Sequence, residues 1–242
     1  MTVFDVSAIR SRFPALSRTE GDRPVAYLDG PGGTQVPDEV IAAMSQRLRV
    51  GTSNTGGAFG ASREADEVVA SAREAAADLL GGRPQEVAFG QNMTSLTFAL
   101  SRALARTWEP GDEVVVTRLD HDANVTPWRL AAADRGAVVK VADFDPADGT
   151  LDLSHVARLV GERTRLVAVT AASNALGTVP PVRQVADLAH AAGAVVFVDA
   201  VHYTPHRLVD VAALGADFLA CSAYKFFGPH TGVLWGKADL LE

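Results

Sequence analysis

The 242-residue sequence has a single cysteine, Cys221, which excludes an intrachain disulfide framework and any zinc or iron–sulfur site built from several cysteines. It also lacks an excess of basic charge, because 29 acidic residues outnumber 22 basic ones and give a net charge of −7. Such a chain is poorly suited to wrapping nucleic acid or to binding an anionic membrane surface. These absences favour a small molecule as the partner and the reducing cytoplasm as the location.

Long apolar runs are missing as well. No segment approaches the ~18 uninterrupted apolar residues of a membrane-spanning helix, and the opening MTVFDVSAIRSRFP does not have the basic-then-apolar pattern of a secretory signal. We therefore expect a soluble, unexported chain. Its 48% hydrophobic residues suffice for a sizeable buried core.

From about Glu86 onward, short β-branched runs alternate with longer amphipathic stretches, which is typical of βαβ units. Several runs are apolar on successive residues, as expected for strands that are covered on both faces. The pattern predicts an α/β domain over residues 86–242, with a mostly parallel central sheet flanked by helices. The predicted strands are 87–89, 113–117, 138–141, 166–170, 195–198, 218–221 and 233–235, and the predicted helices are 95–106, 126–135, 154–161 and 182–192.

The first 85 residues differ and are expected to form an N-terminal segment whose helices pack on the larger domain. The sequence predicts helices at 9–13, 38–49 and 62–80, the last capped by Ser62, and a short strand at 25–28. The run GTSNTGGAFG, residues 51–60, predicts an irregular loop. Glycine there either permits unusual backbone angles or a close ligand approach, and a plain surface loop fits equally well.

Parallel sheets bind ligands beyond the carboxyl ends of their strands, so the residues after each predicted strand are candidates for chemistry. The run GQNMTS follows the first of these strands and opens a helix. Backbone N–H groups there, with the hydroxyls of Thr94 and Ser95, could hold a phosphate, although either hydroxyl could instead be a plain helix cap.

Polar side chains also follow four other predicted strands. His121 and Asn174 follow two of them, and each could simply lie in a solvated turn. Asp199 ends an apolar strand, where an acid is costly unless it meets a cation or several donors. Lys225 lies just past another apolar strand, where its amine could act as a nucleophile or base or could extend to solvent.

Four features fall at one edge of one predicted sheet: the possible phosphate site at GQNMTS, called the anion seat below, and the side chains of His121, Asp199 and Lys225. Pyridoxal 5'-phosphate needs such a set: an amine for a Schiff base, a carboxylate for its pyridine nitrogen, a ring that stacks on it and an anion site. A metal-dependent hydrolase is the competing hypothesis, with Asp199, His202 and His206 as ligands and Asp120 or His121 as a further one. That hypothesis leaves the lysine and the anion seat without a role.

The sequence also resembles a known family. The stretches YLDGPGGTQVP, NMTSLTFALS, HDANVTPW, SNALGT, VDAVHYTPH and SAYKFFGPHTGVLWG match aminotransferase class V in order, and within it the cysteine desulfurase and selenocysteine lyase branch. The resemblance implies the large domain of a fold type I pyridoxal-phosphate enzyme that acts on an amino acid. It favours desulfurase-like or carbon–sulfur lyase chemistry, with an aminotransferase as the alternative, and a homodimer with its active sites near the subunit interface.

Matched residue by residue, the resemblance implies roles for individual side chains. Lys225 would hold the cofactor as a Schiff base, Asp199 would pair with the pyridine nitrogen, and His121 would stack on the ring and take part in catalysis. The remaining implied cofactor-binding residues are Met93, Thr94 and Ser222 at the phosphate, Tyr224 beside them, and Asn174 and His202 toward the phenolic oxygen. No metal is implied.

Departures from the family limit what the resemblance implies about the substrate. His202 stands in place of a usual glutamine, Tyr224 replaces a usual histidine, and the substrate-side histidine of the family falls on Gly56. Cys221 lies within a predicted strand and is expected to be a core residue rather than a sulfur-accepting nucleophile. Because the sequence ends at Glu242, we expect the C-terminal small domain of the family to be absent, and a catalytically incomplete domain is a third hypothesis.

Overall fold

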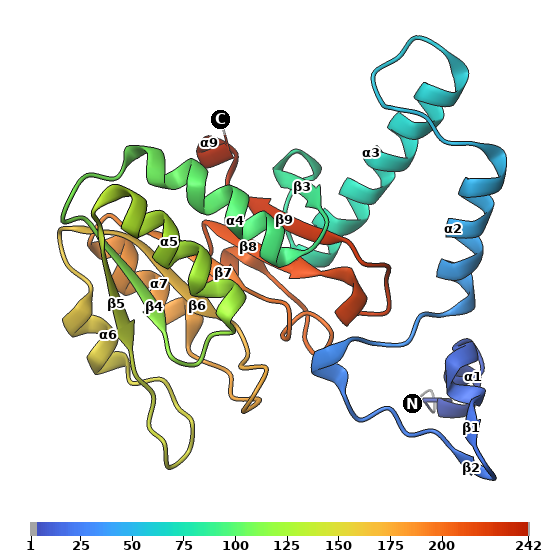
Figure 1. The fold of residues 1–242 in the computed structure, drawn as a ribbon, viewed down its shortest axis with the longest axis horizontal. Helices are drawn as coiled ribbons and strands as arrows, with labels where there is room; N and C mark the ends of the chain where they lie inside the picture. Colours follow the sequence, from blue (N-terminus) through green and yellow to red (C-terminus); the bar gives the residue numbers. More distant parts are fainter. Residues whose placement is uncertain (1–3, 242) are drawn as a thin grey trace. The chain divides into compact units, whose positions relative to one another are not determined.

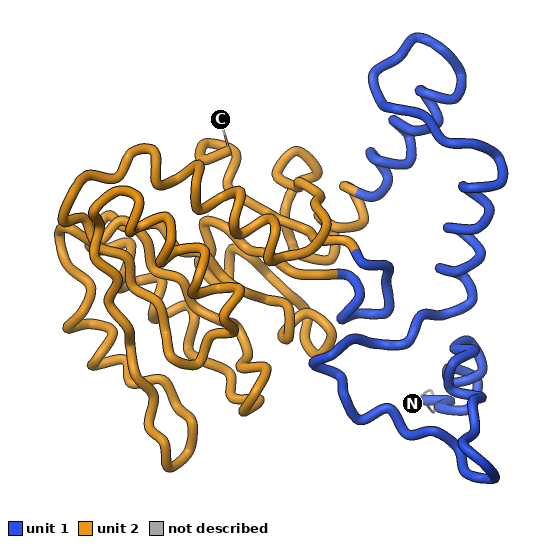
Figure 2. The backbone as a smooth tube through the Cα atoms, viewed as in Figure 1, with its two compact units in different colours: residues 1–72, 223–230 blue, residues 73–222, 231–242 orange. Residues whose placement is uncertain are grey.

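The computed structural model describes residues 4–241, which form two compact units (Figures 1 and 2). The first unit combines the N-terminal residues up to Ala72 with Ala223–His230. The second unit combines Arg73–Ser222 with the residues from Thr231 onward. No helix within residues 4–241 is long and apolar enough to cross a membrane.

The second unit is built around a seven-stranded sheet in the order β3-β9-β8-β7-β6-β4-β5. Its strands are β3 (Val87–Gly90), β4 (Glu113–Thr117), β5 (Val138–Ala142), β6 (Thr164–Thr170), β7 (Val195–Asp199), β8 (Phe218–Ser222) and β9 (Gly232–Gly236). Strands β4 to β8 pair in parallel, whereas β9 runs antiparallel to both of its neighbours. The predicted α/β fold with a mostly parallel sheet is confirmed, and all seven predicted strands are present.

Helices pack on both faces of this sheet. On one face, α4 (Met93–Leu104) packs on β3, β8 and β9, and α5 (Thr126–Arg135) packs on β4 and β5. On the other, α7 (Val182–Ala191) packs on β6 and β7, and α6 (Leu153–Leu159) packs on β5. Short helices α8 (Val211–Leu214) and α9 (Ala238–Leu241) and the 3-10 turns η3 (Pro84–Glu86), η4 (Ala105–Thr107) and η5 (Asp122–Asn124) complete the unit.

The core explains the uninterrupted apolar runs in the sequence. Side chains alternate between the two faces of a strand, so Val114 and Val116 join the core beneath α4 and α5 while Val115 faces the other layer, and all three are fully buried. In the first layer, Trp128 meets Phe197 edge to face with ring centroids 5.1 Å apart. A strand that is covered on both faces must therefore be apolar at every position.

Buried Asp217 joins three elements of the second unit. Its carboxylate accepts the Val196 N–H of β7 at 2.7 Å, meets His190 Nε2 of α7 at 2.8 Å and forms an ion pair with Lys237 after β9. Although burial alone would raise the pKa of Asp217, the hydrogen bonds from Lys237, His190 and Val196 hold it below its usual value. The carboxylate is therefore a fixed charge that ties α7 and β9 to β7.

The first unit holds the N-terminal elements and the turn that follows β8. These elements are α1 (Val6–Arg10), η1 (Pro14–Ser17), β1 (Thr19–Glu20), β2 (Arg23–Pro24), η2 (Gly30–Gly32), α2 (Asp38–Val50), α3 (Gly60–Leu80), which continues into the second unit, and η6 (Ala223–Lys225). The predicted strand at residues 25–28 is wrong. Strand pairing occurs earlier, between β1 and β2, where Gly21 at φ +59° allows the chain to reverse.

The glycine-rich loop before α3 is irregular, as predicted, but Ser62 does not cap the helix. Because α3 begins at Gly60, Ser62 lies inside it and is fully buried. Its hydroxyl accepts the Gly57 N–H at 2.6 Å and donates to the Asn54 carbonyl at 2.7 Å. Ser62 therefore stabilises the loop rather than the end of the helix.

Candidate active site

Seven of the nine predicted site residues lie in the second unit, at the edge of the sheet where the parallel strands end. Asp199 and Ser222 are the last residues of β7 and β8, and His121, Asn174 and His202 follow β4, β6 and β7. Met93 and Thr94 begin α4 and are joined to this edge through Ser222. The other two, Tyr224 and Lys225, follow Ser222 in the chain and belong to the first unit.

The start of α4 is arranged around Thr94. Asn92 is the cap, and its Oδ1 accepts the Ser95 N–H at 2.8 Å. The Met93 N–H donates to the Oγ of buried Ser222 at 2.9 Å. Within residues 4–241, neither the N–H nor the hydroxyl of exposed Thr94 has a hydrogen-bonding partner. The cap interpretation of Thr94 is therefore wrong, and both of its donors are available to an anion at the positive end of the helix.

Glycine at position 232 permits this arrangement. A Cβ atom there would lie 2.4 Å from the carbonyl carbon of Asn92, far inside contact distance. The absence of a side chain in β9 therefore lets the residue that caps α4 approach the sheet.

Two carboxyl groups lie near each other at the sheet edge. Asp199 is buried, and its Oδ1 accepts the Val201 N–H at 2.9 Å. Asp120 is half-buried, and its carboxyl is bonded to the Thr117 hydroxyl and to Asn124 Nδ2, the latter at 2.7 Å. Burial, helped by the charge of Asp199, raises the pKa of Asp120 to about 8. Asp120 is therefore mostly protonated at neutral pH and adds no second full charge beside Asp199.

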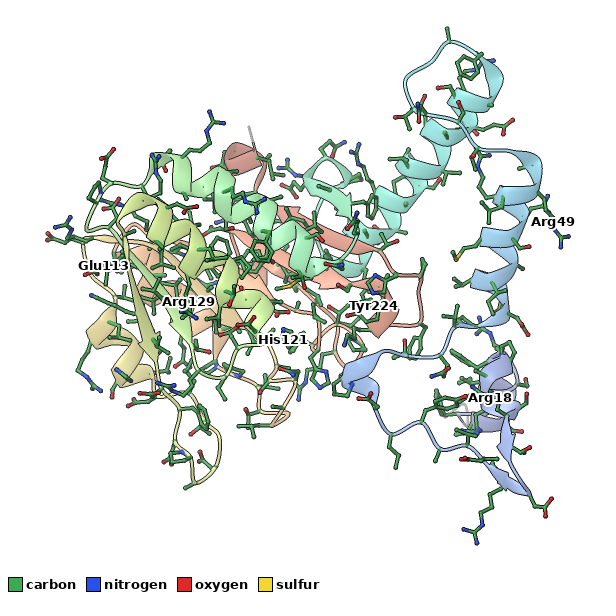
Figure 3. All side chains as sticks on the ribbon, viewed as in Figure 1. Arg18, Arg49, Glu113, His121, Arg129 and Tyr224 are labelled. Carbon is green, nitrogen blue, oxygen red and sulfur yellow. The ribbon has the colours of Figure 1, made fainter. Side chains whose placement is uncertain are left out.

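His121, labelled in Figure 3, precedes η5 and is held by its own turn. Its Nδ1 accepts the Ala123 N–H at 3.0 Å, so the neutral imidazole carries its hydrogen on Nε2. Two further hydrogen bonds hold this turn in place. Trp128 Nε1 donates to Asn124 Oδ1 at 2.9 Å, and Asn124 Nδ2 donates to the Asp120 carboxyl. Asn124 and Trp128 were not among the site residues predicted from the sequence. Their four-residue spacing in HDANVTPW is the signal that would have indicated a contact within one helical turn.

The competing metal site does not form. Among residues 4–241, no group of three or more His, Cys, Asp and Glu side chains is placed to hold a metal ion. The rings of His202 and His206 meet edge to face, with centroids 5.4 Å apart. Cys221 is fully buried in β8, as predicted for a core residue, and burial raises the pKa of its thiol to about 12.

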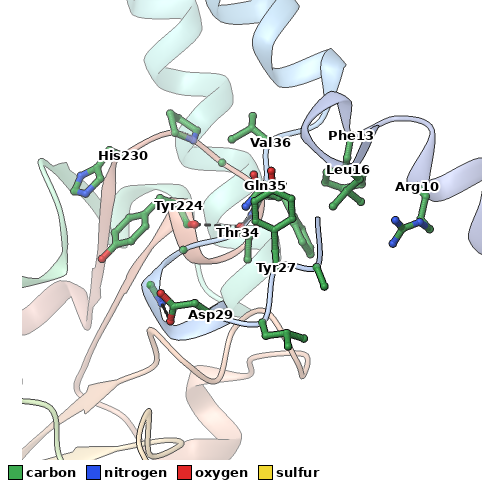
Figure 4. A pocket seen from close by; sticks show the side chains of 18 of the residues that line it. Arg10, Phe13, Leu16, Tyr27, Asp29, Thr34, Gln35, Val36, Tyr224 and His230 are labelled. Atoms are coloured by element: carbon green, nitrogen blue, oxygen red, sulfur yellow. Dashed lines mark hydrogen bonds between the residues drawn. The ribbon is translucent and has the colours of Figure 1, made fainter. Parts of the chain in front are cut away.

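Lys225 lies in the segment Ala223–His230 of the first unit, called the lysine turn below, which begins with η6. Lys225 Nζ lies 4.9 Å from the centroid of the Tyr224 ring, and that ring stacks on His230 with centroids 4.3 Å apart and planes 4° apart. Tyr224 and His230 also line a cavity of about 930 Å³ (Figure 4). Phe13 and Tyr27 of the N-terminal segment form other parts of its wall.

The model of the aminotransferase class-V family matches residues 26–242. The chain belongs to this family. A probable cysteine desulfurase 1 from Mycobacterium leprae (strain TN) is 39% identical over 243 residues, which cover 99% of this chain and 40% of that protein. A cysteine desulfurase from Serratia proteamaculans (strain 568) is 36% identical over 243 residues, 99% of this chain and 60% of its own.

The chain is also similar to solved structures of cysteine desulfurases. The apo cysteine desulfurase from Thermococcus onnurineus NA1 superposes with a TM-score of 0.88 at 29% identity, covering 96% of this chain and 57% of that one. The cysteine desulfurase CsdA from Escherichia coli gives 0.87 at 30% identity, covering 99% and 60%. This member of the class-V family thus spans between 40% and 60% of the length of these four relatives.

Pyridoxal 5'-phosphate is the cofactor of this family, and the donors of the chain fit it chemically. Thr94 offers two donors at a helix N-terminus for a phosphate, both without a partner among residues 4–241, and Asp199 offers a buried carboxylate for a protonated ring nitrogen. Lys225 offers the amine that the cofactor's aldehyde requires.

Proposed function

We propose that this chain is the cofactor-binding part of a pyridoxal-phosphate enzyme that acts on an amino acid by cysteine desulfurase-like or carbon–sulfur lyase chemistry. In this proposal residues 86–242 form the cofactor-binding domain and residues 1–85 an N-terminal segment that packs on it. The start of α4 carries the proposal, because Asn92 and Ser222 engage the N–H groups on either side of Thr94 and leave its two donors for an anion. The desulfurase names of the relatives support the reaction class.

When bound, the cofactor supplies an electron sink for the α-carbon of the substrate. Thr94 would hold its phosphate, beside the Met93 N–H and the Ser222 hydroxyl that orient the helix. The Asp199 carboxylate would hold a proton on the pyridine nitrogen. The Lys225 amine would bind the cofactor's aldehyde carbon and, once the substrate's amine replaces it, would move the proton of the α-carbon.

The other predicted residues would orient the ring. His121 would stack on it with its hydrogen on Nε2, the tautomer that its hydrogen bond with Ala123 favours. Asn174 and His202 would donate toward the phenolic oxygen, and Tyr224 would lie beside the lysine. Cys221 takes no part in sulfur transfer, because a buried thiol with a pKa of about 12 supplies almost no thiolate.

Covalent labelling tests the lysine assignment. The chain has only three lysines, Lys140, Lys225 and Lys237, so a labelled peptide identifies its residue cleanly. The protein is incubated with pyridoxal phosphate, reduced with borohydride, digested and analysed by mass spectrometry. We expect the label on Lys225 in the wild type and in Lys140→Ala, and its loss in Lys225→Ala. Labelling of Lys140 or Lys237 with Lys225 unmodified would overturn the assignment.

Exchange of the α-proton tests the chemistry. The reconstituted protein is incubated with amino acids in deuterated water, and loss of the α-proton signal is followed by NMR. We expect exchange that requires Lys225 and that falls by about 100-fold or more in Asp199→Asn, since general-base and electrostatic contributions are typically this large. Exchange at the wild-type rate in Lys225→Ala would contradict the mechanism.

We further propose that the protein is a cytoplasmic homodimer, as the family resemblance implies. Helix α2 supports an interface, because it buries none of its residues and exposes Ile41, Met44, Leu48 and Val50. Light scattering of the purified protein tests the oligomeric state, and a monomer at micromolar concentration would contradict it.

A further inference from the structure

The turn that carries Lys225 is held by a residue from the distant N-terminal segment. Thr34 lies 190 residues before Tyr224 in the sequence, yet it bonds to the backbone on both sides of the lysine. All of the residues involved belong to the first unit.

Thr34 makes three hydrogen bonds with this turn. Its N–H donates to the Tyr224 carbonyl at 2.9 Å, and its hydroxyl donates to the same carbonyl at 3.1 Å (Figure 4). The hydroxyl oxygen also accepts the Phe227 N–H at 2.7 Å. One hydroxyl thus links residue 224 to residue 227, and Lys225 lies between the two points that it fixes.

The turn needs such support because its backbone is unusual. Phe227 has φ +71°, the one positive value at a non-glycine residue among residues 4–241, and this region is unfavourable for a large side chain. Its ring is 46% exposed and meets the ring of Phe13 edge to face, with centroids 5.5 Å apart. The hydrogen bond that Thr34 accepts from its N–H favours the strained geometry directly.

The same turn orients the groups around the amine. Thr34 binds the backbone carbonyl of Tyr224. The ring of the same residue stacks on His230 and lies beneath Lys225 Nζ. Gly33, at φ +141°, would place a Cβ atom 3.4 Å from this ring, so the N-terminal segment also approaches Tyr224 closely. The segment therefore touches both the backbone and the ring beside the lysine.

We propose that Thr34 is a positioning residue for Lys225, whose hydroxyl holds the turn in the conformation that presents the amine to the cofactor's aldehyde. The inference rests on the proposed function, because it assumes that Lys225 is the attachment residue. Attachment forms a carbon–nitrogen double bond between the Lys225 amine and the aldehyde carbon with loss of water. Thr34 neither touches the reacting atoms nor exchanges a proton with them.

Thr34→Val tests the proposal, since valine has nearly the shape of threonine without its hydroxyl. Initial rates of attachment are measured at several cofactor concentrations by borohydride quenching and peptide mass spectrometry. We expect the maximal rate to fall about tenfold, the effect of losing roughly one net hydrogen bond, while the half-saturating concentration changes less than twofold. Thr34→Ser, which restores the hydroxyl, should recover the rate to within about twofold.

Tyr27→Phe is the matched control. It removes the 3.1 Å hydrogen bond from the Tyr27 hydroxyl to the Ala15 carbonyl, a bond that anchors the same segment and involves no atom of residues 223–230. We expect attachment at the wild-type rate. An equal slowing in Tyr27→Phe would show that Thr34 only anchors the segment, and would overturn the proposal.

A cofactor-free measurement separates this inference from the proposed function. Hydrogen exchange of the Phe227 amide should speed up about tenfold in Thr34→Val and stay as in the wild type in Tyr27→Phe. Unchanged exchange and attachment in Thr34→Val would overturn the positioning role even if the wild type labels on Lys225. Failure of the wild type to label on Lys225 would instead refute the proposed function.

Discussion

The protonated carboxyl of Asp120 should make the stability of the protein depend on pH in an unusual direction. Its pKa of about 8 in the folded chain lies far above the ordinary value of 3.8. Between these values the folded state holds a proton that the unfolded chain has released. The stabilisation from this group is therefore complete below pH 4 and is lost as pH rises toward 8.

The size of the effect follows from proton linkage. Each pH unit in this window lowers the free energy of unfolding by about 1.4 kcal/mol per proton held, so the interval from pH 6 to 7.5 removes about 2 kcal/mol. Asp120→Asn keeps the shape of the side chain but cannot ionise. The free energy of unfolding of the variant, relative to that of the wild type, should rise by about 2 kcal/mol over the same interval.

Urea denaturation followed by tryptophan fluorescence measures both proteins at the two pH values. Both values lie above the pI of 5.4, so the protein carries a net negative charge at each of them. Asp122→Asn, which removes a carboxylate from an exposed side chain two residues away, is the control for the loss of one charge. If the difference between Asp120→Asn and the wild type is the same at both pH values, Asp120 is not protonated in the folded state.

Three further predictions concern other parts of the second unit. The Cys221 thiol should resist iodoacetamide in the native protein and react in urea, and rapid native alkylation would contradict its burial. Asp217→Asn should lower the free energy of unfolding by about 2–3 kcal/mol because it removes the ion pair with Lys237, and an unchanged urea midpoint would refute this. Gly232→Ala should destabilise the protein by about 1–3 kcal/mol and weaken phosphate binding, because its methyl group would displace Asn92, and isothermal calorimetry with inorganic phosphate checks the binding.

The elements that were predicted best carry local signals. Helix α5 has the predicted bounds because Pro127 lies in its first turn and Gly136, at φ +68°, ends it. The bounds of β4 also agree, because a run of valines between polar residues defines them. The strand predicted at residues 25–28 is absent because an apolar run indicates extended backbone but does not supply a strand to pair with.

The candidate site was predictable only where position in the sequence implies position in the fold. Asp199 and Ser222 end strands, so the rule that parallel strands end at one edge was enough to place them together. The protonation of Asp120 depends on burial, which no local pattern reveals. The link from Thr34 to Tyr224 spans 190 residues and depends on how the chain folds back.

The place of β9 in the sheet has a consequence for biosynthesis. Within the described part of the chain, residues 4–241, strand β3 pairs with β9 alone, so Val87–Gly90 leave the ribosome long before Gly232–Gly236 exist to bond with them. At typical translation rates of ~5–20 residues per second, that interval lasts roughly 7–30 s. Throughout this interval β3 lacks its partner strand, and α4 lacks β9, one of the strands on which it packs. Demand for chaperones should therefore stay high until β9 emerges.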